Sequence, residues 1–125
     1  MRIEEAINAH TDWKIRLRWA ISERSTVDIE DISSEETCEF GKWLEREFAV
    51  HIKSSSAYEE CVRAHAKFHQ EAARVAGLIN SKSYSEAEQL LGQETPYSRA
   101  SLEVVHTAKK LGLHALQHVH WENGV

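Results

Sequence analysis

The fold is decided by residues 61–79, which read CVRAHAKFHQEAARVAGLI. Apolar residues recur there every three or four positions, the spacing of an amphipathic helix with one buried face. His65 and His69 fall in the same apolar stripe. Residues four apart lie one helical turn apart on the same side, so both imidazoles can point at a single ion. We therefore expect a buried central helix that contributes two ligands to a metal site.

The composition favours one helical domain. The chain has 125 residues, and 42% of them are hydrophobic, which is enough for one modest core. Gly (5) and Pro (1) are scarce, and this favours helices over sheets. We therefore expect residues 1–125 to form a single all-α domain.

Charge and cysteine content restrict the partners and the compartment. The net charge of −5 argues against nucleic acid as a main partner, because contacts to phosphates need a basic surface. No apolar run is long enough to cross a membrane, and two acidic residues near the N-terminus argue against a secretory signal. We therefore expect a cytoplasmic protein that does not insert into membranes and keeps its two cysteines reduced.

Two more long amphipathic patterns accompany the central helix. They cover about residues 3–24 and 96–121. The second pattern starts with Thr95 followed by Pro96, which is a strong helix start signal. Together with the central pattern they predict three long helices.

Shorter segments connect these helices. Ser33 and Glu36 resemble a capping box that opens a short helix carrying Cys38, and a second short helix is predicted up to Leu91. Residues 25–33 lose the periodic pattern and are interpreted as a linker loop. Three long helices plus one or two short ones, joined by short turns, predict an up-and-down four-helix bundle.

Candidate metal ligands lie on the predicted core faces. They are His10, Cys38, Cys61, His65 and His69. Zinc prefers tetrahedral sites built from imidazole nitrogen and thiolate sulfur. Cys61 and His69 are about 12 Å apart along a helix axis, too far to share an ion, so the helix offers either Cys61 with His65 or His65 with His69. A simpler interpretation treats each residue as an ordinary part of the core, because a buried Cys is a small hydrophobe.

Two other classes of protein are disfavoured. A di-iron enzyme would need carboxylates facing inward, such as Glu three residues before a His, and no Glu lies three before a core-facing His. Four protein ligands would leave no open position for a water molecule on zinc, so we expect no enzyme activity. A helical interaction module with structural histidines, or with a purely structural zinc, remains the alternative.

Three motifs in order carry a family resemblance. AINAHTDWKIRL is followed by CEFGKWL and then by HAKFHQEA, with YSEAEQLL and YSRASLEVV after them. This chain resembles the chemoreceptor zinc-binding domain family, called CZB, over roughly residues 3–113. The resemblance implies that His10, Cys38, His65 and His69 bind zinc and that Cys61 does not. It also implies that Trp13, Lys14, Gly41, Trp43 and Phe68 support the site by packing.

The resemblance further implies a sensory role. Members are helical bundles, often dimeric, at the end of bacterial chemoreceptors or fused to diguanylate cyclases, and they sense zinc and in some receptors oxidants such as hypochlorous acid. This chain contains no receptor coiled coil and no cyclase, so we expect a stand-alone version or an excised fragment. A homodimer whose output passes to a chemoreceptor or diguanylate cyclase partner is the expectation. The segment around Cys38 is expected to move when zinc is lost or the thiolate is oxidised.

Overall fold

The structure is a computed structural model that describes residues 3–33 and 38–122. All regular secondary structure in these two ranges is helical, which confirms the predicted all-α class. No helix in the described part of the chain is both long enough and apolar enough to span a membrane.

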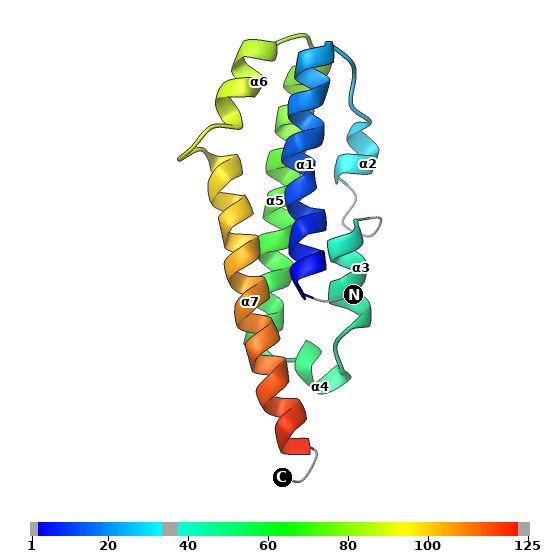
Figure 1. Ribbon diagram of the computed structural model, residues 1–125, viewed down its shortest axis with the longest axis vertical. Coiled ribbons are helices and arrows are strands. Elements are labelled where there is room, and N and C mark those ends of the chain that lie inside the picture. The colour runs from blue at the N-terminus through cyan, green and yellow to red at the C-terminus, as the bar shows by residue number, and fades with distance from the viewer. Residues whose placement is uncertain (1–2, 34–37, 123–125) are drawn as a thin grey trace.

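Three long helices form most of the bundle, as predicted. They are α1 (Ile3–Glu23), α5 (Ser56–Asn80) and α7 (Pro96–Glu122). In Figure 1 the three lie side by side, and α7 extends beyond the others at its C-terminal end. The predicted start of α7 is confirmed, because the Thr95 hydroxyl accepts a hydrogen bond from the Ser98 backbone N–H at 3.1 Å.

The remaining position of the bundle is shared by two short helices. They are α2 (Ile29–Ser33) and α3 (Glu39–Arg46), which follow one another downward beside α1 (Figure 1). The chain therefore runs up through α1, down through α2 and α3, up through α5 and down through α7. This is the predicted up-and-down topology.

The short helices are more numerous than predicted. Two of them, α3 and α6 (Tyr84–Leu90), correspond to the short helices predicted, although Cys38 directly precedes α3 and does not lie within it. The other two, α2 and α4 (Val50–Lys53), were not predicted. The interpretation of residues 25–33 as a loop was wrong for α2. The side chain of Asp28 accepts a hydrogen bond from the Asp31 backbone N–H at 3.2 Å, and Ile32 is fully buried. A capped turn of this length forms because tertiary packing supports it. Glu36 of the predicted capping box lies outside the described residues.

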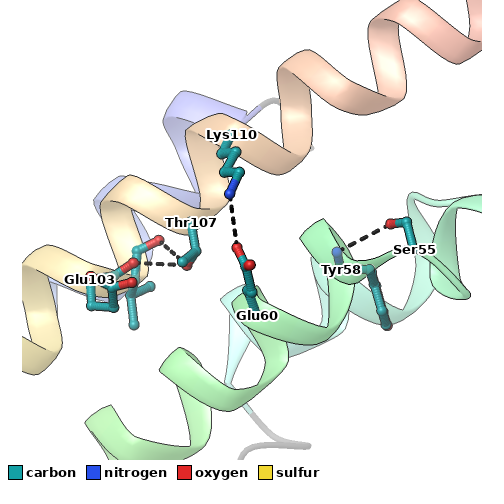
Figure 2. A network of polar contacts seen from close by, with 7 residues as sticks. Ser55, Tyr58, Glu60, Glu103, Thr107 and Lys110 are labelled. Carbon is teal, nitrogen blue, oxygen red and sulfur yellow. Dashed lines mark hydrogen bonds and ion pairs between the residues drawn. The ribbon is translucent and has the colours of Figure 1, made fainter.

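Helices α5 and α7 are held together by hydrophobic packing and by a polar contact at the edge of their interface. Lys110 on α7 contacts the Glu60 carboxylate on α5 at 3.1 Å (Figure 2). Thr107 is buried one turn before Lys110, and its hydroxyl donates to the backbone carbonyl of Glu103 at 2.8 Å. Cys61, the next residue along α5, is fully buried and forms a hydrogen bond with Thr107. This places Cys61 in the interface between the two long helices.

Candidate metal centre

Three of the predicted ligands come together in the core. The ligand atoms of Cys38, His65 and His69 all lie within 4.8 Å of one another, and all three residues are buried. His65 and His69 stand one turn apart on α5, whereas Cys38 directly precedes the first residue of α3. Ligand atoms around a tetrahedral zinc lie roughly 3–4 Å apart, given bonds of about 2.0–2.3 Å. A small contraction of this group would therefore enclose an ion.

The two imidazoles of the group are oriented by their hydrogen bonds. His69 Nδ1 lies 2.5 Å from the backbone carbonyl of Ile32. A carbonyl can only accept, so Nδ1 carries the proton and the lone pair of neutral His69 is on Nε2. That Nε2 lies 2.9 Å from Nε2 of His65. Two lone pairs at this distance would repel, so one proton satisfies the pair, and a metal ion can take the place of that proton.

The Cys38 thiol is set up to ionise. Burial acts to raise its pKa, but hydrogen bonds from the side chains of His65 and His69 and from the Gly41 backbone outweigh burial and lower the pKa to about 5. The thiolate is the form of cysteine that binds metals. Cys38 therefore supplies a charged, soft ligand beside the two imidazoles of His65 and His69.

His10, the fourth predicted ligand, lies next to this group but is not part of it in the described structure. Its ring is fully buried and packs against Phe68, with ring centroids 4.0 Å apart. Burial and the charges of His65 and His69 lower its pKa to about 3, although a backbone hydrogen bond at Ser101 acts in the opposite direction. The imidazole is therefore neutral near pH 7 and keeps one nitrogen able to bind a metal.

The nitrogen atoms of His10 have different surroundings. Nε2 lies 3.2 Å from the hydroxyl oxygen of Ser101 on α7. Nδ1 is buried and has no hydrogen-bond partner among the described residues. Buried polar atoms in proteins are nearly always satisfied, so an orphaned nitrogen on a buried imidazole that interacts electrostatically with His65 and His69 fits a missing metal ligand bond. The donor set as a whole suits zinc.

Cys61 has a different environment from Cys38. Burial raises the pKa of its thiol to about 11, and a hydrogen bond with Thr107 reduces this rise. Cys61 is absent from the close group of metal-binding side chains among the described residues. Of the two pairs that spacing left open on α5, the structure therefore brings His65 and His69 together with a cysteine, and that cysteine is Cys38.

A pocket of about 220 Å³ opens at Cys38 between α1, α2 and α3. Its lining consists of Ala9, Asp12, Trp13, Arg16, Asp31, Cys38 and Glu39. Three of these side chains are acidic and one is basic, so the pocket favours cations. Cys38 is a ligand candidate that lines it, and small molecules or ions can therefore approach the centre beside Cys38.

The aromatic surroundings of the centre agree in part with the predicted support. Trp13 meets the His69 ring edge-on at a centroid distance of 6.4 Å, and Phe68 does so at 5.5 Å. The backbone of Gly41 forms a hydrogen bond with the Cys38 side chain. Phe40, at 5.0 Å from the His65 ring, was not predicted as a neighbour of the site.

Two polar partners of the histidines were also missed by sequence analysis. One is the carbonyl of Ile32, whose helix could have been found from the Asp28 cap and from the spacing of Ile29 and Ile32. The other is Ser101. No sequence signal distinguishes Ser101 from Ser98, the other serine of α7, because the role of Ser101 depends on how α7 lies against α1.

Fold and site together define a small helical domain with a buried Cys and His cluster that can hold a metal ion. The family model described as "Chemoreceptor zinc-binding domain" matches residues 10–76, a segment that begins at His10 and includes Cys38, His65 and His69. The match covers more than half of the chain, which therefore belongs to the chemoreceptor zinc-binding domain (CZB) family, as the motifs indicated. No curated protein and no solved structure matches the chain.

Proposed function

We propose that this chain is a non-catalytic zinc-binding regulatory domain whose ion is held by His10, Cys38, His65 and His69. The observation that carries the proposal is the convergence of Cys38, His65 and His69 within 4.8 Å in the core of a CZB family member. Thiolate and imidazole donors favour zinc over magnesium or calcium, which prefer oxygen ligands. Zinc would supply a fixed positive charge that joins α1, α3 and α5.

The regulatory part of the proposal rests on how the ligands are distributed. Cys38 precedes α3, and His69 holds the carbonyl of Ile32 in α2. Without the ion, each buried ligand left unsatisfied costs about 1–3 kcal/mol. The helices α2 and α3, which are short and share one position of the bundle, are the elements whose stability this loss would reduce most. They are the moving part in our proposal.

The output and stimulus follow from the same reasoning. We propose a cytoplasmic homodimer that passes the zinc state to a chemoreceptor or diguanylate cyclase partner in bacterial signalling, without nucleic-acid or membrane contacts. The acidic total charge of −5 is consistent with the absence of nucleic acid among its partners. Cys38 lines a pocket and has a lowered pKa, which supports oxidation of its thiolate as a second stimulus.

The first experiment measures zinc per chain after purification without added metal. Wild type, Cys38→Ala and the matched control Cys61→Ala are compared. We expect one equivalent of zinc in wild type and Cys61→Ala and a strong loss in Cys38→Ala. If wild type takes up no zinc even when it is supplied, or if only Cys61→Ala loses it, the proposed ligand set is wrong.

A second experiment separates regulation from a purely structural zinc or a plain interaction module. Hydrogen exchange is followed with and without the ion. We expect exchange in α2 and α3 to rise when zinc is removed by a chelator, while the middle of α5 stays protected. An unchanged pattern in both short helices would contradict the regulatory proposal and favour the interaction module.

A further inference from the structure

The contact between His10 and Ser101 links the candidate centre to a helix outside the matched segment. His10 is on α1, at the first position of the family match, and Ser101 is on α7, beyond its last matched residue at 76. Their side chains approach to 3.2 Å between Nε2 and Oγ. The contact spans 91 positions of sequence, so it depends on the packing of α7 against α1.

The hydrogen bond limits how His10 can bind an ion. A neutral imidazole has one N–H and one lone pair. If Nε2 accepts from the Ser101 hydroxyl, then Nδ1 carries a proton that finds no acceptor among the described residues. If Nε2–H donates to Ser101, then Nδ1 carries the lone pair, and a metal ion would satisfy it. Only the second arrangement leaves no buried donor unpaired once an ion is bound.

In His69 the roles of the two ring nitrogens are the reverse of those in His10. His69 uses Nδ1 to donate to the Ile32 carbonyl, and its Nε2 belongs to the close group with Cys38 and His65. Outer partners of this kind fix the tautomer and the ring orientation of histidine ligands. In His69 the outer partner is a backbone carbonyl, whereas in His10 it is Ser101, whose backbone also hydrogen-bonds with the imidazole and whose hydroxyl can be removed by substitution.

We propose that Ser101 is a positioning residue that holds His10 in the tautomer with Nε2–H and so assigns Nδ1 as its zinc-binding atom, in contrast to Nε2 for His69. The inference rests on the proposed function, since it concerns the same ion. It adds α7 to the elements that the zinc site joins. Ser101 itself does not bind the ion.

Zinc affinity tests the role of the hydroxyl with a matched pair of variants. Ser101→Thr keeps the hydroxyl, whereas Ser101→Val introduces a side chain of the same shape as threonine but without the hydroxyl. We expect the dissociation constant for zinc, measured by competition with a chelator, to rise about 10-fold or more in Ser101→Val and to stay near wild type in Ser101→Thr. Ser98→Val, one turn earlier on α7, controls for a branched residue in the helix and should leave the affinity unchanged.

The ligating nitrogen is identified directly by NMR on wild type, so this test does not depend on whether a variant folds. The protein is loaded with ¹¹³Cd²⁺, and couplings from the metal to the imidazole protons are recorded. Nδ1 has one neighbouring ring carbon that carries a proton, whereas Nε2 has two. We expect His10 to show coupling to Hε1 without Hδ2, and His69 to show both.

Each outcome bears on a different statement. Coupling of His10 to both ring protons, or equal zinc affinities for Ser101→Thr and Ser101→Val, would overturn the role of Ser101 while leaving the zinc site intact. Failure of wild type to bind zinc or cadmium would overturn the proposed function, and the inference with it. Nδ1 coupling together with a specific loss of affinity in Ser101→Val supports the inference.

Discussion

His69 donates its Nδ1–H to the backbone carbonyl of Ile32 at 2.5 Å, so one imidazole belongs both to the metal-binding group and to the contact between α5 and α2. The side chain of the same residue, Ile32, is fully buried. The position of this carbonyl, and with it the orientation of His69, therefore depends on hydrophobic packing as well as on the hydrogen bond.

Truncation of Ile32 should weaken zinc binding as well as the fold. We expect Ile32→Ala to lower the free energy of unfolding of the zinc-free protein by about 2–5 kcal/mol, through the cavity it creates. It should also raise the zinc dissociation constant about 10-fold, because the partner of His69 is no longer held in place. Denaturant unfolding and chelator competition measure the two effects.

Ile79→Ala is the control for this variant. Ile79 is equally buried, with 1% of its surface exposed, but lies at the far end of α5. We expect a similar loss of stability and an almost unchanged zinc affinity. Equal weakening of zinc binding in both variants would show that affinity follows general stability and that Ile32 has no special role.

The two cysteines should react at very different rates. In the zinc-free protein we expect iodoacetamide at pH 7 to modify Cys38 first, because its pKa is lowered to about 5 and it lines a pocket. Cys61 is fully buried with a raised pKa, so it should react only after unfolding. Peptide mass spectrometry measures both rates, and bound zinc should protect Cys38. Faster labelling of Cys61 than of Cys38 would contradict this account of the two thiols.

The periodic spacing of apolar residues predicted the long helices and their buried faces. The stripes of α1, α5 and α7 are long enough for the period to decide the helix and its buried face, and the pair His65 and His69 follows from one turn of α5. Spacing alone could not decide whether Cys38 or Cys61 belongs to the metal-binding group. The family motifs favoured Cys38, and the structure brings Cys38 into the group.

What the sequence did not predict depends on contacts between distant segments. Helix α2 has too few residues for a period, and it is stabilised by burial of Ile32 and by His69. Ser101 becomes a neighbour of His10 only when α7 packs on α1. Such contacts leave no mark in the local pattern of a single sequence.

The raised pKa of Cys61 predicts a loss of stability at alkaline pH. Its thiol has a pKa of about 11 in the folded protein and near 9 when unfolded, so between these values the unfolded chain releases a proton that the folded chain keeps. The stabilising contribution is complete below about pH 9 and is lost as the pH rises to about 11. The shift corresponds to roughly 3 kcal/mol.

Cys61→Ala tests this linkage. Its free energy of unfolding should fall less between pH 9 and 11 than that of wild type, although it is lower at pH 7 because a buried side chain has been shortened. Tyrosine and lysine titrations are common to both proteins and cancel in the difference. Parallel pH profiles for the two proteins would mean that Cys61 is not held in the protonated form.

Gly77 in α5 offers a stabilising substitution. Apart from its chain neighbours and the nearby backbone of α5, a Cβ built at this position meets no atom within 4 Å among the described residues, and Gly77 lies inside a regular helix. Alanine is favoured over glycine in a helix interior by about 0.8–1.0 kcal/mol, largely because it restricts the unfolded chain. We expect Gly77→Ala to raise the free energy of unfolding by about that amount and to leave the zinc dissociation constant unchanged.

Gly112→Ala provides the contrast on α7. There a Cβ would lie 2.7 Å from the Cδ1 atom of Ile3 on α1, so the Ile3 side chain must move to make room. The gain in helix propensity is then offset by disturbed packing, and we expect a smaller gain than at Gly77 or a net loss. Denaturant unfolding of the two variants side by side measures the difference. If Gly112→Ala stabilised the protein more than Gly77→Ala, the close approach of α1 and α7 at Ile3 would be wrong.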